Sequence, residues 1–520
     1  MQRPTGTIDG ESAGLPSGDR TGDKSAAGCP VAGHGAASSA PAEAPAPDVE
    51  AAAPGTYMPP CPLRPASTPP VWKLIGLARR NFLSVWPTSA FAKPWLRVAV
   101  LRKQIFVCNS PDLVQEAFVR KHDTFERKSA QMRHALEPLL GDGLFISDGE
   151  TWRRRRQIVG PIIHASKVRD FFPVMAETIA ERRAAWEAAG PDAPVDMLQE
   201  MAHLTAEIIC RTIFGSQLGR DYAAEVVESF TDYQRHIDQI DLISLLGLPD
   251  WLPRRRGRAI RRAVARIDKV LDEIITSYEA RRSDGETSVI GGLLEARDED
   301  GKPLSREAIR NEAAVIFMAG HETTANTLAW AWFLLSQAPW AREALKTELD
   351  TVLAGRTPEF SDVARLSYTR AVIEETLRLY PPVPILAREA LADDTIGGVA
   401  TPKGSLVMVV PWLLHRNPEL WQRADNFEPE RFLGATRGGQ SKFGYVPFAI
   451  GPRICAGLAF GLTESILSLA MLAQGFDVRL EPGTDVQPVC RLTLRPGERL
   501  PMRLQPRRAA APHAHRQAHP

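Results

Sequence analysis

One segment of ten residues near the C-terminal end constrains the fold more than any other part of the chain. Residues 448–457 read Phe-Ala-Ile-Gly-Pro-Arg-Ile-Cys-Ala-Gly, so that Cys455 has a glycine four positions before it and another two positions after it. Because glycine carries no Cβ atom, these positions let the backbone run close beneath a flat ring system. The apolar run at residues 458–472 predicts a buried helix directly after this segment. The amides at the start of such a helix favour the thiolate form of Cys455.

The cysteine in this segment has two interpretations. A free thiol is most often an inert part of a core, but five fixed residue types at these spacings are typical of a thiolate ligand to haem iron. Arg453 offers a forked cation for a haem propionate. The segment resembles the haem-binding loop of the cytochrome P450 family, Phe-x-x-Gly-x-Arg-x-Cys-x-Gly. The resemblance implies that Cys455 is the metal ligand, that Arg453 and Phe448 belong to the cofactor-binding loop, and that the cofactor is haem b, iron protoporphyrin IX.

A second segment of interest lies inside a long, largely apolar stretch at residues 304–337, which predicts a buried central helix. It contains Ala-Gly-His-Glu-Thr-Thr at residues 319–324, where Gly320 and Thr323 are three apart and share a helix face. Glycine plus threonine also bends helices, so a simple kink is the alternative. Glu322 and Thr323 pair an acid with an alcohol, which suits proton delivery to dioxygen. The segment resembles the family's Ala/Gly-Gly-x-Asp/Glu-Thr-Thr/Ser motif, and the resemblance implies that Gly320, Glu322 and Thr323 are catalytic.

Two other motif fragments do not support a competing function. His321-Glu322 begins a zinc-protease pattern, but Ala325 stands where the second histidine is required. Gly141-x-Gly143-x-x-Ile146 lacks the third glycine of a dinucleotide fingerprint and lies in no βαβ unit. Because the sequence shows no flavin or nicotinamide domain, we expect electrons to come from separate proteins, a ferredoxin- or flavodoxin-type donor with its reductase.

Glu375-Thr376-Leu377-Arg378 forms part of a predicted helix that the prolines at 381 and 382 end. Taken alone, Glu375 and Arg378 are an i,i+3 surface pair worth a few tenths of a kcal/mol. They resemble the family's Glu-x-x-Arg motif, and Arg431 stands in a Pro-Glu-Arg-Phe segment that resembles its partner. The resemblance implies that these three residues form a buried structural network.

Haem propionates require cations, and the sequence offers several. Trp152 and Arg156 are four apart in a Trp-Arg-Arg-Arg-Arg run, which resembles the family's Trp-x-x-x-Arg element. Arg388 matches another propionate arginine that follows the Glu-x-x-Arg helix in the family. The resemblance implies that Trp152, Arg156 and Arg388 bind the cofactor. We interpret residues 153–155 as a solvated run that forms, with Arg453, a basic surface for an acidic electron donor.

The role of His122 and His134 is not decided by the sequence, and we interpret both as structural or exposed side chains. The 63 basic and 62 acidic residues give a net charge of +1, which argues against a nucleic-acid-binding protein. Six scattered cysteines without a Cys-x-x-Cys pair indicate neither a zinc site nor a disulfide framework. The chain has no run of 18 apolar residues and no signal peptide in its first 20 residues. We therefore expect a cytoplasmic protein without a transmembrane segment.

We expect three parts along the chain. Residues 1–70, rich in Ala, Pro, Gly and Ser, are predicted to be disordered. Residues 71–506 form a single haem domain, and residues 507–520 form a disordered tail. The dipeptides Cys29-Pro30 and Cys61-Pro62 lie in the first part. Such pairs bind regulatory haem in some proteins, but we interpret them as coincidence in so Pro-rich a segment.

The resemblance implies a mainly α fold with a small β part, like that of soluble bacterial members of the family. The sequence pattern agrees with it. It predicts a strand hairpin at 96–107, a short helix at 111–119, helices over 171–296 broken at Gly247, Pro249 and Pro253, and a strand at 400–410.

The function that the resemblance implies is a haem-thiolate monooxygenase that inserts one oxygen atom from O2 into a lipophilic substrate. We expect the pocket walls at residues 127–146, 317–323 and 383–386. A fatty acid, a terpenoid and a steroid remain open as substrates. A peroxide-driven hydroxylase and a haem sensor without turnover are the alternatives.

Overall fold

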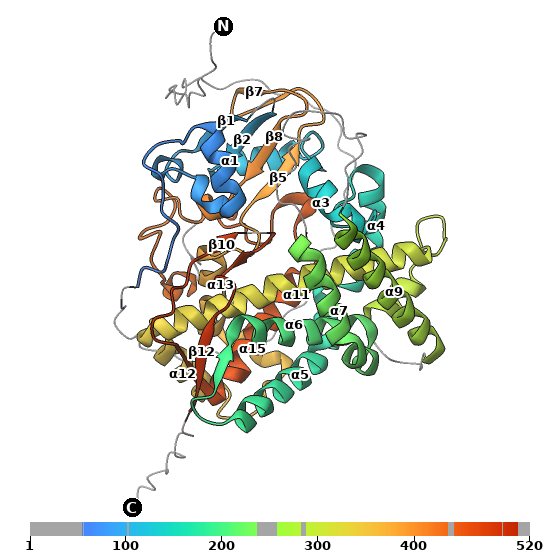
Figure 1. The fold of residues 1–520 in the computed structure, drawn as a ribbon, viewed down its shortest axis with the longest axis vertical. Helices are drawn as coiled ribbons and strands as arrows, with labels where there is room; N and C mark the ends of the chain where they lie inside the picture. Colours follow the sequence, from blue (N-terminus) through green and yellow to red (C-terminus); the bar gives the residue numbers. More distant parts are fainter. Residues whose placement is uncertain are drawn as a thin grey trace, which may run out of the picture.

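The computed structural model describes Gly55 and residues 57–100, 103–236, 257–281, 288–434, 441–490 and 492–507. The predicted helix breaks at Gly247, Pro249 and Pro253 and the pair Cys29-Pro30 lie outside these residues. The described chain forms a large helical part beside a smaller part that contains a five-stranded sheet (Figure 1). The predicted mainly α fold with a small β part is confirmed.

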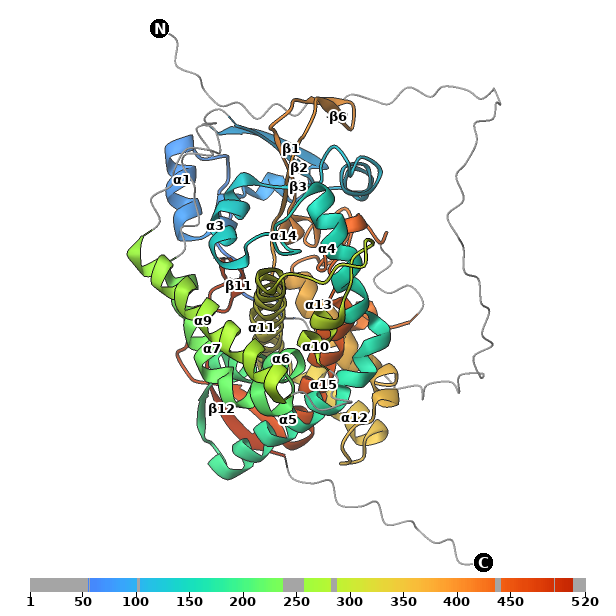
Figure 2. The ribbon, with the colours of Figure 1, turned by 90° about the vertical axis from the view of Figure 1, so that its right-hand side faces the viewer.

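The helix α11, Arg306–Gln337, runs through the helical part and is surrounded by other helices (Figure 2). Ser305 caps its start, because its side-chain oxygen accepts a hydrogen bond from the Ala308 amide at 3.1 Å. Apolar residues occupy nearly all of its faces, and most of its 32 residues are buried, as expected for a helix in the middle of a domain. The predicted central helix is confirmed within two residues at its start.

The other helices pack around α11 or extend the smaller part. They are α1 Val71–Arg80, α2 Pro111–Gln115, α3 Ala130–Leu140, α4 Gly149–Ile162, α5 Val168–Ala189, α6 Met197–Phe214, α7 Ser216–His236, α9 Arg258–Arg281, α10 Val289–Glu295, α12 Pro339–Val352, α13 Ser367–Leu379, α14 Pro411–Leu414 and α15 Leu458–Gly475. A short π-helical turn, η3 Glu116–Arg120, continues α2. The helix predicted after the cysteine segment is α15, and its predicted end is three residues short.

The main sheet has the strand order β1-β2-β8-β5-β3. Its strands are β1 Trp95–Val100, β2 Lys103–Cys108, β3 Arg127–Lys128, β5 Leu386–Glu389 and β8 Leu406–Val409. The strands β1 and β2 form the predicted antiparallel hairpin. The single strand predicted at 400–410 is wrong, because β7 Val399–Thr401 and β8 are separate strands with a turn at Gly404, whose φ is +81°. A left-handed φ of this kind interrupts a strand and favours glycine.

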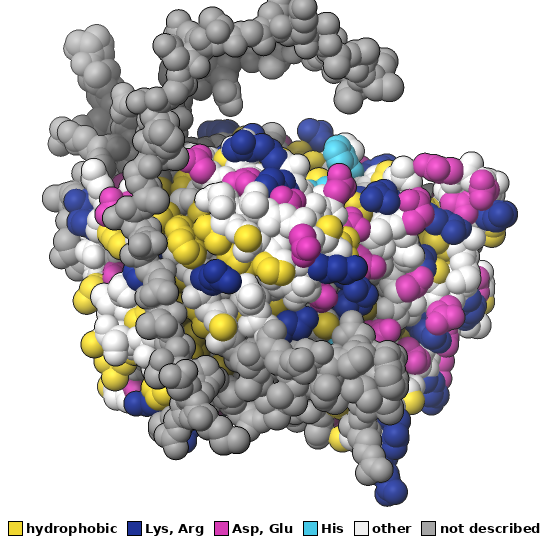
Figure 3. Space-filling model, turned by 90° about the horizontal axis from the view of Figure 1, so that it is seen from above, with side chains coloured by type: hydrophobic (Ala, Val, Ile, Leu, Met, Phe, Trp, Pro, Cys, Tyr) yellow, Lys and Arg dark blue, Asp and Glu magenta, His cyan; other side chains and the backbone are white. Residues whose placement is uncertain are grey.

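Smaller pairings complete the β structure. A three-stranded sheet has the order β4-β12-β9, and two two-stranded sheets pair β10 with β11 and β6 with β7. Their bounds are β4 Pro194–Asp196, β6 Asp394–Ile396, β9 Phe476–Leu480, β10 Val489–Cys490, β11 Leu494–Arg495 and β12 Pro501–Pro506. On the face seen from above, basic and acidic side chains are interspersed (Figure 3), in keeping with the small net charge.

The predicted boundary of the N-terminal segment needs a correction. The carbonyl of Tyr57 accepts a hydrogen bond from the Phe427 amide at 2.9 Å, and the carbonyl of Pro60 accepts one from the Tyr380 hydroxyl at 2.7 Å. Arg64 forms an ion pair with Asp425. The stretch that begins at residue 57 therefore packs on the domain, because the domain supplies partners that its own composition does not reveal. Residues 1–54 and 56 lie outside the described chain.

The C-terminal boundary shifts by one residue. Arg507, predicted to start the tail, donates a hydrogen bond to Asp350 at 2.9 Å and another to the carbonyl of Ala473 at 3.1 Å. Residues 508–520 lie outside the described chain. Cys61 of the second Cys-Pro pair is half-buried and accepts a hydrogen bond from Arg64 at 3.7 Å.

Candidate active site

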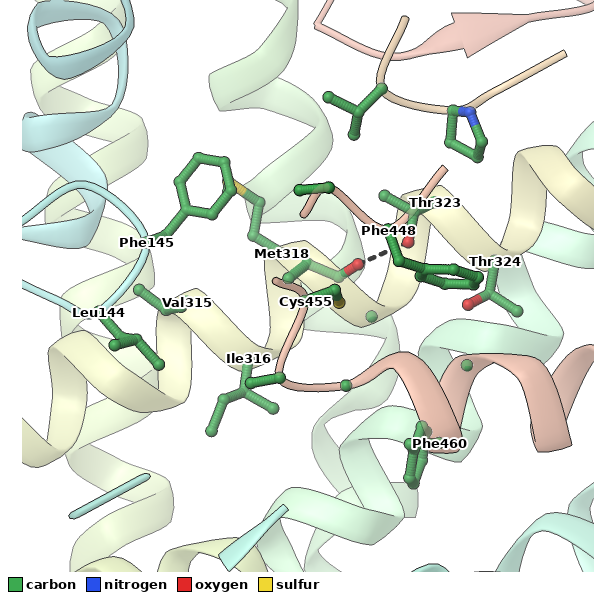
Figure 4. A pocket seen from close by; sticks show the side chains of 18 of the residues that line it. Leu144, Phe145, Val315, Ile316, Met318, Thr323, Thr324, Phe448, Cys455 and Phe460 are labelled. Atoms are coloured by element: carbon green, nitrogen blue, oxygen red, sulfur yellow. Dashed lines mark hydrogen bonds between the residues drawn. The ribbon is translucent and has the colours of Figure 1, made fainter. Parts of the chain in front are cut away.

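A cavity of about 300 Å³ separates α11 from the loop that carries Cys455. Figure 4 shows residues of α11 and of this loop around the same space, with the Cys455 side chain at its centre. The three predicted wall segments all contribute side chains to it. Lining residues in these segments include Lys128, Met132, Leu136, Leu144, Phe145, Met318, Gly320, Thr323, Val383 and Leu386. The surface of Cys455 that remains exposed therefore faces the cavity.

The sequence did not predict the walls that come from other helices. Val159 and Ile163 at the end of α4, Phe171 on α5, and Ile209 and Thr212 on α6 also line the cavity. These residues share no motif, and their apolar positions look like ordinary core positions in the sequence. Only the packing of α6 against α11, of α5 against α6, and of α4 against α10 brings them to one space.

The loop before Cys455 is held by its own backbone and by a neighbouring turn. The Cys455 amide donates a hydrogen bond to the Phe448 carbonyl at 2.9 Å. Gly451 has a φ of +74°, and a Cβ atom there would lie 2.1 Å from the Phe118 carbonyl oxygen of η3. This glycine is required by the contact with η3 as well as by its φ. In contrast, a Cβ atom at Gly457 would meet no protein atom within 4 Å, and Gly457 lines the cavity. That position leaves the room that a flat cofactor needs.

The protonation state of Cys455 depends on what fills the cavity. Burial raises the pKa of its thiol, while the Gly457 amide and the positive charges of Arg156 and Lys128 lower it. Burial is the largest of these effects. A coordinated metal cation deprotonates a thiol outright. The site therefore fits a thiolate that forms when iron binds.

Four cations line the cavity, Lys128, Arg156, Arg388 and Arg453, and we call them together the cation wall. Burial, reinforced by Arg453, lowers the pKa of Arg388 to about 9, and burial lowers that of Arg453 to about 10. The pKa of Lys128 lies well below its usual range for the same reason, with Arg388 and Arg453 adding to it. Buried cations need anions beside them. The wall therefore fits a group with two carboxylates, as haem has.

Hydrogen bonds support this interpretation of the cation wall. Arg453 donates from Nη2 to the Ser147 carbonyl at 2.8 Å, and its Nε has no partner among the described residues. Arg388 is 2% exposed and donates only to the carbonyl of Ala387 in the hydrogen bonds that the described chain forms. Trp152 is buried, and the Arg453 guanidinium lies 4.4 Å from the centroid of its ring. The predicted residues Trp152, Arg156, Arg388 and Arg453 are thus brought together.

Lys128 is the cation that the sequence analysis missed. It stands on β3 directly opposite Arg388 on β5, because these two short strands pair antiparallel. A strand of two residues gives no periodic signal, so only the pairing could have revealed it.

The expectation for residues 153–155 is partly wrong. Arg155 is buried and donates to both carboxylate oxygens of Asp142 at 2.9 Å. Arg154 forms an ion pair with Asp298, and Arg153 forms one with Glu150 at 3.2 Å. Arg155 is therefore not a solvated member of the run, whereas Arg153 and Arg154 are exposed as predicted. Arg453 points towards the cavity, so the basic surface loses two of its four predicted members and stays a prediction for the other two.

The catalytic segment of α11 differs from expectation in detail. A Cβ atom at Gly320 would lie 2.9 Å from Ile209 Cδ1, so this glycine also allows α6 to approach α11 closely. The Thr323 hydroxyl faces the cavity and donates to the Ala319 carbonyl at 2.7 Å. Glu322 is buried and lines the same cavity. All three predicted catalytic residues therefore lie at one wall.

Glu322 has partners that the sequence did not reveal. It accepts hydrogen bonds from the Thr493 hydroxyl at 2.6 Å and from Arg495 Nε at 2.9 Å. Both partners belong to the segment around β11, more than 170 positions along the chain. Arg495 and Glu322 thus form an ion pair at the edge of the cavity. Thr493 also lines the cavity and joins the carboxylate to the space above Cys455.

The predicted structural network is present beside the segment that leads to Cys455. Glu375 and Arg378 are both 0% exposed and form two hydrogen bonds at 2.7 and 2.8 Å. Arg431 donates to the same carboxylate at 3.1 Å. Arg378 also donates to the His415 carbonyl at 2.8 Å, and His415 Nε2 accepts from the Val446 amide at 2.9 Å. The network therefore reaches the loop that ends at Cys455.

Of the two undecided histidines, His122 is half-buried, with its ring centroid 6.2 Å from that of Trp152 and an ion pair to Asp123 at 3.2 Å. His134 lies on α3. Neither lines the cavity, in agreement with a structural role.

A mainly α fold with a cysteine facing a cation-walled cavity beneath a central helix defines the haem-thiolate class of proteins. The family model "Cytochrome P450" matches residues 62–499, and the chain belongs to the cytochrome P450 family. It is a haem-dependent monooxygenase, as predicted.

Several known proteins are similar to this chain. Cyclooctatin synthase of Streptomyces melanosporofaciens is 34% identical over 78% of this chain and 86% of its own length. Cyclooctat-9-en-7-ol 5-monooxygenase of the same organism is 31% identical over 85% of this chain and 95% of its own length. The crystal structure of the cytochrome P450DA heme domain has a TM-score of 0.75 and 25% identity, and covers 86% of this chain and 99% of that one.

Among the described residues, one helix is long and apolar enough to cross a membrane, and it is α15. Of its 18 residues 67% are buried in the protein, and it follows directly on the Cys455 loop. A core helix has the same length and composition, which makes this weak evidence for a membrane span.

Proposed function

We propose that this monooxygenase binds a neutral, lipophilic, cyclic substrate in the cavity between α11 and the Cys455 loop. Haem bound there supplies the activation of dioxygen, and the residues of the chain orient the cofactor, exclude water and deliver protons. The main support for this proposal is that Cys455 lines a largely apolar cavity together with the four residues of the cation wall.

In this proposal the haem-binding residues divide into three groups. Cys455 is the iron ligand. The Phe448 carbonyl accepts a hydrogen bond from the Cys455 amide and so shapes the loop. Trp152, Arg156, Arg388 and Arg453 bind the propionates, and Lys128 joins them. Their support is positive charge, buried at Lys128 and Arg388 and half-buried at Arg156 and Arg453, that exceeds the one carboxylate buried beside them among the described residues, Glu126. Two further carboxylates would balance it.

The proposed proton path uses Glu322 and Thr323 of α11. Thr323 presents its hydroxyl to the cavity, and Glu322 lies in a hydrogen-bonded group with Thr493 and Arg495. An alcohol can accept a proton from one side and donate one on the other, and a carboxylate can exchange the proton. Gly320 keeps the helix surface free of side-chain atoms beside Thr323.

The charge distribution of the cavity favours a neutral substrate over a fatty acid. The cations that line it among the described residues are those already assigned to the propionates. The other walls are aliphatic or aromatic, with Leu136, Leu144, Phe145 and Val315 among them. Two relatives are named for cyclooctatin and cyclooctat-9-en-7-ol, neither a carboxylic acid by name. Of the classes left open by the sequence, a terpenoid or steroid alcohol therefore fits better.

We further propose that electrons come from a separate ferredoxin or flavodoxin through its reductase, and that the protein works in the cytoplasm. The described cysteines are all free, which is typical of a reducing compartment. Arg155 is buried and therefore does not belong to the docking face for the donor, while Arg153 and Arg154 are exposed.

Carbon monoxide binding tests the proposal for the iron ligand. The reduced protein should develop the red-shifted Soret absorption of thiolate ligation, and a Cys455→Ala variant should not. Titration with cyclooctat-9-en-7-ol, a steroid alcohol and a long-chain fatty acid should then shift the haem spin state most with one of the two alcohols. A shift with the fatty acid alone contradicts the neutral-substrate proposal.

A further inference from the structure

The loop between α3 and α4, residues 141–147, supplies the apolar cavity walls Leu144 and Phe145. It also contains the two glycines of the incomplete dinucleotide pattern. A Cβ atom at Gly141 would lie 2.2 Å from Asn311 Nδ2, and one at Gly143 would lie 2.6 Å from Val315 Cγ2. Both contacts are on α11. The glycines are therefore needed because the loop is pressed against the central helix.

One carboxylate holds this loop. Glu312 on α11 is 0% exposed, and its two oxygens accept the Leu144 amide at 3.0 and 3.2 Å. Arg155 of α4 places its Nε 3.5 Å from the same carboxylate and binds Asp142 of the loop with Nη2. Asn311 donates to Asp142 at 3.2 Å. Three elements, α4, α11 and the loop, thus meet at one buried acid.

We propose that Glu312 is a positioning residue that fixes Leu144 and Phe145 in the substrate cavity and so determines which substrates fit. The inference rests on the proposed function of that cavity. Glu312 itself is not among the residues that line the cavity. It acts through its hydrogen bond with the Leu144 amide, and the Leu144 side chain forms part of the cavity wall.

The free-energy cost of burying this carboxylate favours a positioning role for Glu312 over a role in packing alone. Burying a carboxylate is costly, and an apolar side chain of similar size at this place avoids that cost. An apolar residue would, however, leave the buried Leu144 amide without its acceptor, which costs about 1–3 kcal/mol in general. The loop would then shift to find another partner, and the wall would shift with it.

The far end of the loop is tied to the cofactor side. The Ser147 carbonyl accepts the Arg453 guanidinium at 2.8 Å, and Lys128 Nζ lies 4.6 Å from the centroid of the Phe145 ring. The loop therefore spans the cavity from α11 to the cation wall. A change at Glu312 should alter the space for large ligands while the iron ligand stays in place.

The protonation state of Glu312 offers an independent readout. Burial raises its pKa to about 7, against the opposing effects of the Leu144 amide and Arg155, and Asp142 adds to the rise. Among the described residues, the charged groups that face it are Arg155 from α4 and Asp142 from the loop. Protonation below this pKa removes the charge that attracts the amide and the guanidinium. The interactions of Glu312 with the Leu144 amide and with Arg155 should therefore weaken below about pH 7.

The test compares a small and a large neutral haem ligand, methyl isocyanide and phenyl isocyanide, on the reduced haem-loaded enzyme. In a Glu312→Leu variant the affinity for phenyl isocyanide should fall about tenfold and that for methyl isocyanide less than about twofold. A Glu312→Gln variant, which keeps one acceptor, should lose about threefold. Phenyl isocyanide affinity of the unmodified enzyme should fall from about pH 8 to about pH 6, and this pH dependence should vanish in both variants.

The matched control is Glu307→Leu, since Glu307 is exposed in the first turn of the same helix. It should change neither affinity. Hydrogen exchange of the Leu144 amide adds a readout that does not depend on haem ligands. It should accelerate in Glu312→Leu and stay unchanged in Glu307→Leu. An equal loss for both isocyanides, or unchanged Leu144 exchange, overturns the proposal.

A folding defect in Glu312→Leu would not end the test. Asp142 is 56% exposed in its side chain, so Asp142→Asn should fold, and it should weaken phenyl isocyanide selectively by about threefold. Without that selective loss the proposal is wrong. Should the unmodified protein lack the thiolate-type carbon monoxide spectrum, the proposed function fails, and Leu144 exchange still decides the role of Glu312.

Discussion

Two buried carboxylates show how differently the two sides of the cavity are built. Glu375 on α13 accepts hydrogen bonds from Arg378, Arg431 and the Glu428 amide. Glu312 on α11 accepts one amide, and its nearest guanidinium lies 3.5 Å away. Both acids are 0% exposed. The difference lies in how completely each negative charge is matched.

A buried carboxylate whose charge is balanced by several hydrogen-bonded cations holds its neighbours rigidly. A buried carboxylate with few such partners holds them less rigidly. Glu375 stands behind the loop that positions Cys455, and the proposed iron ligand would tolerate little movement there. Glu312 holds a wall of the substrate cavity, where a shift of the loop changes only the space available. We therefore expect the side of the cofactor to be more rigid than the side of the substrate.

Removing the Glu375 charge should have the largest effect on this comparison. A Glu375→Gln variant leaves the buried Arg378 guanidinium without its anion, while Arg431 keeps Glu428 as a partner. The loss of the Arg378 pair should destabilise the fold by about 3–5 kcal/mol. Urea unfolding followed by circular dichroism measures it. The matched Glu312→Gln change should cost less than about 2 kcal/mol, and equal losses at both sites would contradict the distinction.

The glycines of the two loops should differ in the same direction. Gly451→Ala places a Cβ atom 2.1 Å from a backbone oxygen at a φ of +74°, so we expect a loss of about 2–4 kcal/mol and reduced haem retention. In Gly143→Ala the new Cβ atom lies 2.6 Å from a Val315 methyl group and 2.9 Å from the Leu140 carbonyl oxygen. Because no left-handed φ adds to the strain, we expect a smaller loss of about 1–3 kcal/mol. Thermal unfolding of the two variants compares them, and a larger loss at Gly143 would reverse the ranking.

The two sides should also respond to pH with opposite signs. Burial lowers the pKa of His415 to about 3, with Arg378 adding to the effect. Between the usual value of about 6.5 and this value, only the unfolded chain binds the proton. Stability should therefore fall by about 1.4 kcal/mol per pH unit as pH decreases through this window.

For Glu312 the folded pKa is raised, so its protonation stabilises the fold, and this contribution disappears as pH rises from about 4.5 to about 7. Urea titrations at a series of pH values, on His415→Gln, Glu312→Gln and the unmodified protein, isolate the contribution of each group to the pH dependence of the unfolding free energy. The His415 variant should lose stability less steeply towards acid, and the Glu312 variant more steeply. Slopes of the same sign in both difference curves would refute this assignment.

The smallest effect on stability is expected at Thr323, which lies between the two sides. Thr323→Ala removes one hydroxyl that returns to its own helix, and unfolding should change by less than about 1 kcal/mol. Electrons should instead be diverted from substrate oxidation to hydrogen peroxide, measured as peroxide released per electron donor consumed. Unchanged coupling would contradict the proposed role of Thr323 in proton delivery.

The motifs of the sequence predicted much of the site because each is local. Cys455 with its loop, Glu375 with Arg378, and Gly320 with Thr323 are separated by few residues, so chain geometry alone keeps them together. The pairs that the sequence missed are distant in the chain. Lys128 meets Arg388 through strand pairing, and Arg495 meets Glu322 through the packing of β11.

The same limit explains the wrong predictions. Arg155 looked like a solvated member of a basic run, yet Asp142 and Glu312 surround it. The stretch after residue 56 looked disordered by composition, yet Tyr380 and Asp425 bind it. In each case the deciding partner lies elsewhere in the chain, and composition carries no information about it.

By itself, the amino-acid order determined the family and the central helix and predicted the haem ligand, because these depend on short spacings and on apolar periodicity. Tertiary structure alone decided which cations share a wall, which acid holds residues 141–147, and which glycines are needed for close contact. Such features depend on charges and atoms meeting across long separations in the chain, where burial strengthens electrostatic interactions and makes every unmatched group costly.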